Sequence, residues 1–479
     1  MLRNFSFIVL LLSHVFLFGQ NTTVSTPTKI PASIDKVKLV GKNADGYVVR
    51  LSGNEEIFQA YSNDLRLSVA KKYEFNKNEG FIQHVHLLKS GMIVYFLRAE
   101  SNFTTLVAQI IDNKLQKVGA TAVIDTLYES IELANANLRS YSDPSKKYIL
   151  FYIPFFANKQ VIHMQMTTTD YANNIVSKSK IGIGRNEREM AYAKAFLDTA
   201  GNAVLVLNGS NTSFEFHTID KENGLSQANR VNFGKQLFGD PYFEIDNKNG
   251  GLIFAGFYDN KEGTGEAAAY GVFYQKYSLE SGKPFASNII SMPDSFMRKL
   301  TGREASITNN RLFTFNIKKI TQRIDGGVAI IAESFIRDTR QEQSISISVI
   351  NPYNNFRTIN SFQYNDIIAF SINAEGAMEW NTILRKRQYS EEDNGYFSSF
   401  LTVNTKDKLF FLYSDDETQS SDLDIYELNS NGIAYKKLIA TKQEKDLRYI
   451  PKLGKQTALN EALLPSIRKG IFHLVRFKF

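Results

Sequence analysis

Two neighbouring segments in the last quarter of the chain concentrate carboxylates that could bind a metal ion. YSEEDNG includes Glu391 and Asp393, and SDDETQSSDLD includes Asp415 and Asp416. Ca²⁺ prefers hard oxygen ligands, which carboxylates supply. The spacing matches no defined calcium loop, such as D-x-[DN]-x-[DN]-G. These four residues are candidate calcium ligands, with a solvated surface as the competing interpretation, and no other cofactor is indicated.

Aromatic side chains border several polar loops and could bind an uncharged ligand. The candidate ligand-binding residues are Phe155, Tyr258, Phe335 and Tyr413. Aromatic rings beside amide groups suit a sugar ring or an extended peptide, because each ring has an apolar face. The same rings could equally complete the core at the ends of strands.

Recognised catalytic motifs are absent from the sequence. It has no G-x-S-x-G elbow, no H-E-x-x-H motif, no P-loop and no cysteine nucleophile. His84 and His86 share one strand face, but a metal site would need His163 or His217 from another part of the chain. They are interpreted as ordinary strand histidines.

Paired carboxylates leave glycoside cleavage open, because a repeat fold can draw such a pair from distant segments. The candidates are Asp240, Asp259, Glu333 and Asp415. Each is more simply explained as a turn or strand-end residue. Enzymatic activity is therefore left open, and a non-enzymatic protein is favoured.

The segment RIDGGVAIIAES, from Arg323 to Ser334, raises the question of whether a glycine-rich turn holds a phosphate. A phosphate loop needs a following helix whose amide groups face the anion. Here Asp325-Gly326-Gly327 is followed by an apolar run typical of a strand. The segment therefore predicts a tight turn between two strands.

Polar turns followed by apolar runs occur eight times along the chain. Their usual spacing is roughly 45 to 60 residues, with longer gaps around the sixth, which is the range of propeller repeats. In the second unit, FIQHVHLL, MIVYFLRAE, TTLVAQII and LQKVGATAV indicate four strands joined by short turns. The eight segments begin at Asn43, Leu88, Asp143, Asp198, Asp246, Arg323, Thr405 and Ile467.

The apolar runs, such as MIVYFL and YILFYI, do not alternate with polar residues. A strand with one face in water would alternate, whereas a strand covered on both faces would not. Burial of this kind favours the adjacent blades of a β-propeller over stacked sandwiches. We predict an all-β propeller of about eight four-stranded blades, with seven blades plus an accessory hairpin as the alternative.

The segment YSDPSKKYILFY, which begins at Tyr141, resembles the SPDGKK-I-F signature of the WD40-like propeller repeat in the periplasmic TolB-type family. The match covers one unit well and the turn-led apolar element of the other units loosely. Asp143-Pro144 reverses the order found in the family, and the glycine is missing. The resemblance implies a propeller and carries no catalytic residue.

The chain divides into three parts. Residues 1–19 combine Arg3 with an apolar stretch, as in a secretory signal peptide. Residues 20–36 form an N-terminal segment that could supply a ring-closing strand, because the chain is expected to end two strands into its eighth unit. Residues 37–479 form the propeller, and a polar insertion at 334–365 in the sixth unit is expected to be an external flap.

Composition narrows the compartment and the partner. The net charge of +7 is scattered, unlike the basic stripe of a nucleic-acid-binding protein. The chain has no cysteine and, after residue 19, no apolar segment long enough to span a membrane, and its residue usage resembles that of exported Bacteroidota proteins. We expect an exported, non-enzymatic binding or scaffold propeller of the periplasm or cell surface, with an envelope protein or glycan on its variable-loop face. The alternatives are a propeller glycosidase or polysaccharide lyase, and a structural subunit of an outer-membrane or secretion assembly.

Overall fold

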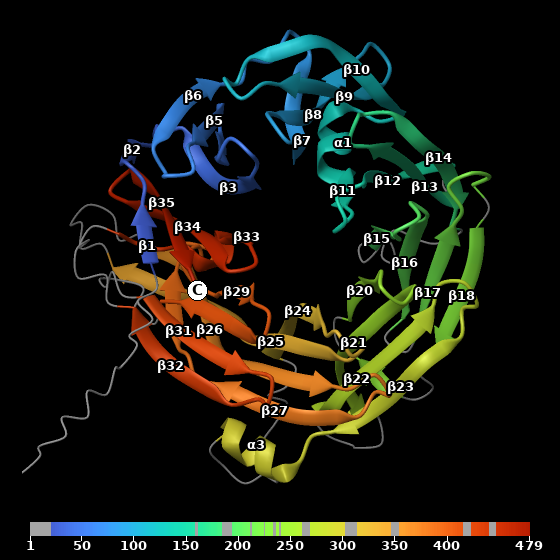
Figure 1. Ribbon diagram of the computed structural model, residues 1–479, viewed down its shortest axis with the longest axis vertical. Coiled ribbons are helices and arrows are strands. Elements are labelled where there is room, and N and C mark those ends of the chain that lie inside the picture. Colours follow the sequence, from blue (N-terminus) through green and yellow to red (C-terminus); the bar gives the residue numbers. More distant parts are fainter. Residues whose placement is uncertain are drawn as a thin grey trace, which may run out of the picture.

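The turn-led apolar runs form eight antiparallel sheets around a central axis in the computed structural model of the chain (Figure 1). In the five sheets that have four strands, strands that are neighbours in sequence are also neighbours in space. This arrangement confirms the predicted β-propeller of eight four-stranded blades. The structure describes residues 21–158, 161–183, 194–210, 213–224, 226–232, 236–238, 241–260, 269–301, 314–345, 354–414, 423–439 and 447–479.

The first four blades each consist of four consecutive strands, with the first strand nearest the axis (Figure 1). Blade 1 contains β3 (Ile34–Lys42), β4 (Tyr47–Gly53), β5 (Glu56–Tyr61) and β6 (Leu67–Lys72). Blade 2 contains β7 (Glu79–Leu87), β8 (Met92–Ala99), β9 (Thr104–Ile111) and β10 (Lys117–Leu127). Blade 3 contains β11 (Arg139–Ser142), β12 (Tyr148–Asn158), β13 (Val161–Asp170) and β14 (Ile175–Gly182). Blade 4 contains β15 (Lys194–Leu197), β16 (Ala203–Ser210), β17 (Ser213–Ile219) and β18 (Ser226–Asn232).

Three of the last four blades carry an additional short strand. Blade 5 contains β19 (Gln236–Phe238), β20 (Tyr242–Asp246), β21 (Gly251–Asn260), β22 (Ala269–Ser278) and β23 (Pro284–Ser291). Blade 6 contains β24 (Phe315–Gln322), β25 (Val328–Ile345), β26 (Asn354–Ile372), β27 (Met378–Leu384) and β28 (Gln388–Glu391). Blade 7 contains β29 (Leu401–Asn404), β30 (Lys408–Tyr413), β31 (Leu423–Asn429) and β32 (Ala434–Ile439). Blade 8 contains β33 (Lys455–Ala458), β34 (Glu461–Arg468), β35 (Ile471–Lys478), β1 (Asn21–Val24) and β2 (Thr28–Lys29).

Burial on both faces explains the uninterrupted apolar runs. In β8, six consecutive residues from Met92 to Leu97 are buried. Their side chains point alternately into two cores: Ile93 and Tyr95 pack with residues of blade 3, whereas Met92 and Val94 pack with residues of blade 1. A strand enclosed between two other blades therefore needs apolar side chains on both faces.

The Asp325-Gly326-Gly327 segment is a turn between β24 and β25. Gly326 has a φ of 89°, in the region that favours glycine. The carboxylate of Asp325 accepts a hydrogen bond from the Gly327 amide at 3.1 Å. A strand follows this turn, so no helix N-terminus is present to hold a phosphate.

The two ends of the chain meet in blade 8. β1 pairs with β35 in an antiparallel register that places Asn21 beside Lys478 and Val24 beside Val475. The sheet thus combines three C-terminal strands with two N-terminal strands, β1 and β2, which both pair with β35. The expectation that the chain ends two strands into its eighth unit is wrong. The missed strand is β33, whose sequence KQTA has no apolar run to reveal it, and the turn after Ile467 joins β34 to β35.

The predicted insertion in the sixth unit continues two strands of blade 6 outward. β25 and β26 are 18 and 19 residues long, and they remain paired as far as Ile345 beside Asn354. β28 pairs with the same extension, between Ser361 and Tyr364. The segment 334–365 therefore lies largely in a lengthened hairpin, in which the polar backbone groups are satisfied by cross-strand hydrogen bonds.

Among the described residues, short helices occur at three connections. They are α1 (Ile131–Asn137), α3 (Asp294–Thr301) and the 3₁₀ helix η3 (Pro451–Leu453). The Ser130 hydroxyl caps α1 by accepting a hydrogen bond from the Leu133 amide at 3.4 Å. Across the described ranges, the structure contains no helix with the length and apolar character needed to cross a membrane.

Candidate functional site

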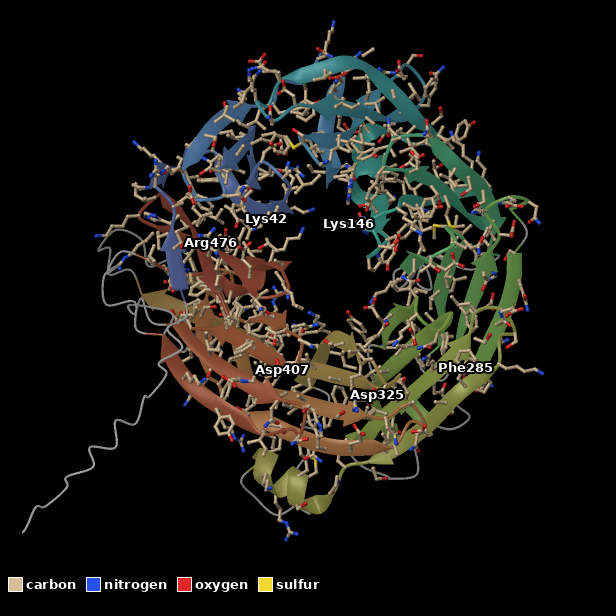
Figure 2. The ribbon with its side chains drawn as sticks, viewed as in Figure 1. Lys42, Lys146, Phe285, Asp325, Asp407 and Arg476 are labelled. Carbon is tan, nitrogen blue, oxygen red and sulfur yellow. The ribbon has the colours of Figure 1, made fainter. Side chains whose placement is uncertain are left out.

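Basic side chains from neighbouring blades gather beside the central axis. Lys38 lies on β3, Lys455 lies on β33, and Lys146 lies in the turn between β11 and β12. β3 packs against both β33 and β7, so blades 8, 1 and 2 meet here. Figure 2 shows Lys146, and also Lys42 at the end of β3, at the edge of the central opening. Ring closure therefore brings lysines from the two ends of the chain together.

These lysines repel one another. Burial lowers the pKa of Lys455 below its usual value, and the charges of Lys38 and Lys146 lower it further. Burial also lowers the pKa of Lys38, with a contribution from Arg50. Lys38 and Lys455 are nevertheless exposed residues. Their side chains therefore reach solvent beside the central axis.

His84 lies on β7 and is held by two hydroxyl groups of blade 3. Its Nδ1 is 3.0 Å from the Ser140 hydroxyl, and its Nε2 is 3.0 Å from the Ser142 hydroxyl. Burial, followed by the charges of Lys38, His86 and Lys455, lowers the pKa of His84 to about 3. This ring is therefore neutral at ordinary pH.

His86 lies two residues further along β7 and is only 7% exposed. Its ring lies 3.6 Å from the ring of Tyr171, centroid to centroid. Burial, followed by the charges of Lys146 and Lys455, lowers the pKa of His86 to about 4. Among the described residues its Nε2 has no hydrogen-bond partner. We call Lys38, His84, His86, Lys146 and Lys455 the basic cluster.

The lysines of the basic cluster lack the ion pairs found elsewhere on the inner strands. Lys42 pairs with Glu461, with 3.1 Å between Nζ and Oε1. In the described part of the chain, by contrast, no carboxylate pairs with Lys38, Lys146 or Lys455. Like charges without a paired carboxylate destabilise a fold, so their gathering beside the axis marks a candidate binding site.

The opposite side of the axis combines both signs of charge. Lys194 lies on β15, Tyr242 and Glu244 lie on β20, and Lys319 lies on β24. The Tyr242 hydroxyl donates to Glu244 at 3.4 Å. Burial raises the pKa of Glu244, while Lys319 and Lys194 act in the opposite direction. We call these four residues the mixed cluster.

The four candidate calcium ligands are only partly within the described residues. Glu391 forms an ion pair with Arg340, with 3.0 Å between Oε1 and Nη2. Asp393 accepts hydrogen bonds from the Ser390 hydroxyl at 2.6 Å and from a turn amide at 2.7 Å. Asp415 and Asp416 lie outside the described residues. Within the described ranges no three acidic or histidine side chains are grouped as metal ligands, and the calcium site stays a prediction.

The four candidate aromatic residues fall into two pairs. Tyr413 and Tyr258 are buried, with 0% and 5% of their surface exposed, and both belong to cores between blades. Phe155 and Phe335 are half-buried. The Phe155 ring stacks on His163 with 5.3 Å between centroids. These residues are not brought together by any contact among them, and a ligand at them stays a prediction.

Glu333, a candidate for glycoside cleavage, is fully buried between blades 6 and 7. It pairs with Lys386, also fully buried, at 2.8 Å between Oε1 and Nζ. The Ser399 hydroxyl donates to its other oxygen at 2.6 Å. Both residues of the pair belong to blade 6, and Ser399 reaches the pair from the connection to blade 7. Breaking such a buried pair is costly, so the pair stabilises blade 6. The side chains of the other candidates lie outside the described residues: Asp240, Asp259 and Asp415.

The basic cluster is not predicted by the sequence, although two of its members share a recognisable strand face. His84 and His86 are two residues apart, but the lysines that surround them are scattered along the chain. A usable signal is the basic character of the innermost strands, such as β3, whose sequence is IDKVKLVGK. Only the closed ring places Lys455 next to that strand.

Comparisons with known proteins support no assignment beyond the fold. No family model matches the sequence, and no curated protein matches it. The WD40 domain of SCAP from fission yeast is 9% identical, with a TM-score of 0.40 over 95% of this chain and 98% of that one. A structure from a study of two prolyl endopeptidases is 10% identical, with a TM-score of 0.40 over 94% of this chain and 55% of that one. An ulvan lyase from a new polysaccharide lyase family is 10% identical, with a TM-score of 0.39 over 83% of this chain and 92% of that one.

Proposed function

We propose that this chain is an exported binding propeller that takes an anionic ligand at the basic cluster beside its central axis. The observation that carries the proposal is the set of three lysines, from separate blades beside the central axis, that have no carboxylate partners among the described residues. A ligand with negative charge would relieve their mutual repulsion. Binding would therefore raise the pKa of Lys455 and Lys38 toward the usual value.

The positive charges of these lysines favour an anionic ligand over a neutral one. Field lines are focused where protein atoms exclude water, so the attraction between a lysine and an anion is stronger there than at an open surface. The variable loops remain a second possible contact for a large ligand. Of the glycans that the sequence leads us to expect, an acidic glycan therefore suits this site better than an uncharged one.

The exported and non-enzymatic parts of the proposal have separate support. Export rests on the signal-like composition of residues 1–19, which lie outside the described residues. A non-enzymatic role rests on the lack of catalytic motifs in the sequence and on the ion pair that occupies Glu333.

The test is binding of acidic polysaccharides to the purified protein, measured by calorimetry at low and at physiological salt. A sulfated polysaccharide and a polyuronate are the probes, with a neutral glucan as the reference. In the double variant Lys38→Gln/Lys455→Gln we expect affinity for the acidic chains to fall ~10-fold or more, since each charge-assisted contact contributes ~1.5–3 kcal/mol.

The matched control removes the same charge from the outside of the ring. Lys71 on β6 and Lys117 on β10 are exposed residues of outer strands. The double variant Lys71→Gln/Lys117→Gln should bind like the unmodified protein. Equal loss of affinity in both double variants, or equal binding of the neutral glucan, would show that net charge or nonspecific adhesion explains the result.

A further inference from the structure

A group of polar atoms is buried behind the basic cluster, in the seam between blades 2 and 3. It comprises Nε2 of His86 on β7, the Tyr95 hydroxyl on β8, the Thr169 hydroxyl on β13, and the Tyr171 hydroxyl in the turn after β13. Among the described residues none of these atoms has a hydrogen-bond partner of good geometry. Buried polar atoms are nearly always satisfied in folded proteins, so four in one seam require an explanation.

Contacts among these residues place the polar atoms in one region. The His86 and Tyr171 rings are in contact, with 3.6 Å between centroids and an angle of 38° between the ring planes. Burial raises the pKa of both Tyr171 and Tyr95. Tyr95 raises the pKa of Tyr171 further, and the Thr169 hydroxyl lowers the pKa of Tyr95, so the three hydroxyl groups lie near one another. Lys146 lies close enough to His86 to lower its pKa.

Every polar group of this seam can donate a hydrogen bond: a neutral histidine from Nε2, each hydroxyl, and the ammonium group of Lys146, which can only donate. Two carboxylates lie nearby, Asp143 beside Tyr171 and Asp170 beside Tyr95. Both are already occupied by backbone amides of their own turns, at 3.0 and 3.3 Å for Asp143 and at 2.9 and 2.7 Å for Asp170. Lys146 would repel a cation. The seam is therefore suited to an acceptor with several oxygens.

We propose that a compact tetrahedral oxyanion, phosphate or sulfate, binds between Lys146 and Nε2 of His86 and accepts hydrogen bonds from the Tyr171 and Tyr95 hydroxyls. This inference rests on the proposed function, because it specifies the charged group of the anionic ligand. The oxyanion is either a free ion or the terminal group of a larger molecule, and the two share the same chemistry at the protein.

The number and placement of the donors favour a tetrahedral dianion over a carboxylate. The donors come from four separate elements of blades 2 and 3: β7, β8, the β11–β12 turn and the β13–β14 turn. A carboxylate presents two oxygens in one plane, whereas phosphate and sulfate present four. A second negative charge also matches the presence of Lys455 beside Lys146 and His86.

The experiment measures binding of inorganic phosphate, inorganic sulfate, a phosphate monoester and acetate to the purified protein by calorimetry. Two variants test the seam. His86→Phe keeps a ring against Tyr171 and removes Nε2, and Lys146→Asn removes the charge from a residue with a φ of 57°, a conformation that asparagine tolerates. Lys147→Asn is the matched control, because Lys147 is an exposed residue of the same turn.

We expect phosphate or sulfate to bind, acetate to bind at least ~10-fold more weakly, and each seam variant to lose ~10-fold or more in affinity, as removal of a charge-assisted hydrogen bond predicts. The control should be unchanged, and circular dichroism should show that the variants are folded. Tighter binding of the monoester than of the free ion would identify a terminal group, and the reverse would identify a free ion. Acetate binding as tightly as phosphate, or unchanged phosphate binding in both seam variants, would overturn the proposal.

Failure here is distinguishable from failure of the proposed function. If polyuronate binds and responds to Lys38 and Lys455 while no inorganic oxyanion binds, only the oxyanion seat is rejected. If neither the polysaccharides nor the oxyanions bind, both proposals are rejected.

Discussion

The charged side chains on the two sides of the central axis differ in whether they have partners of opposite charge. In the mixed cluster, Glu244 lies close enough to Lys319 and Lys194 for each charge to stabilise the other. In the basic cluster, Lys38 and Lys455 only repel each other. Both sides are built from the innermost strands of the same fold, so the difference is not required by the architecture. The proposed function accounts for this difference, because an anionic partner would supply the missing negative charge.

The largest expected effect comes from giving the basic cluster its own carboxylate. Lys455→Glu should reduce affinity for acidic polysaccharides by ~100-fold, because it removes one attractive charge and adds a repulsive one. The melting temperature should stay the same or rise, since the new carboxylate would face Lys38 and Lys146. Calorimetry and thermal unfolding check the two results. A protein that is less stable and still binds would contradict the comparison.

Acid should destabilise the protein through His86. The pKa of His86 is about 4 in the folded chain, below the ordinary histidine value of 6.5, so the unfolded chain binds protons more readily. The contribution of neutral His86 to the free energy of unfolding is therefore fully present above pH 6.5, and it is lost as the pH is lowered from 6.5 to about 4. This histidine accounts for a loss on the order of 2–3 kcal/mol over that window.

Denaturant unfolding at pH 7 and pH 4 measures this dependence, with His86→Phe for comparison. The variant should lose less stability between the two pH values than the unmodified protein. An identical loss in both proteins would show that the acid sensitivity arises elsewhere.

Removing the carboxylate from the mixed cluster should make it resemble the basic cluster. In Glu244→Gln, Lys319 loses the charge that raises its pKa, so this pKa should fall further. We expect a second, weak anion site, with an affinity ~10-fold below that of the first, because the mixed cluster has two lysines where the basic cluster has three. Phosphate titration of the variant would reveal it. Unchanged stoichiometry would mean that the mixed cluster lacks the geometry for an anion.

The smallest effect is expected at a lysine that already has a partner. Lys42→Gln breaks the ion pair with Glu461, a pair in which the lysine side chain is 30% exposed. Stability should fall by ~1 kcal/mol or less, as for other partly exposed pairs. Anion affinity should remain within a factor of ~2, a difference of less than 1 kcal/mol. A large loss of affinity would place Lys42 in the site and weaken the distinction between paired and unpaired lysines.

Much of the fold follows from local patterns. The turn at Gly326 and the continuous run from Met92 to Leu97 predict hairpins buried on both faces, and the structure has both. β33 escapes prediction because four mostly polar residues give no periodic signal. The segment 334–365 suggests a flap although it forms a lengthened hairpin, because polar composition is shared by loops and by exposed strands.

The candidate site is less accessible to sequence reasoning. His84 and His86 are conspicuous by their spacing, but their low pKa values depend on burial and on lysines from other blades. The same limit applies to Glu333, which is a strand residue in sequence and one half of a buried ion pair in three dimensions. The charge that surrounds a group cannot be read from its neighbours in the chain.

The amino-acid sequence by itself determined the class of fold, because turn chemistry and the burial of each strand are properties of short segments. The tertiary structure alone decided which charges meet. Closing the ring joins β35 to β1 and sets β33 against β3, so that Lys455 and Lys38 share one space. Electrostatic interactions depend on distance in space, and no local pattern encodes the distance between the two ends of a chain.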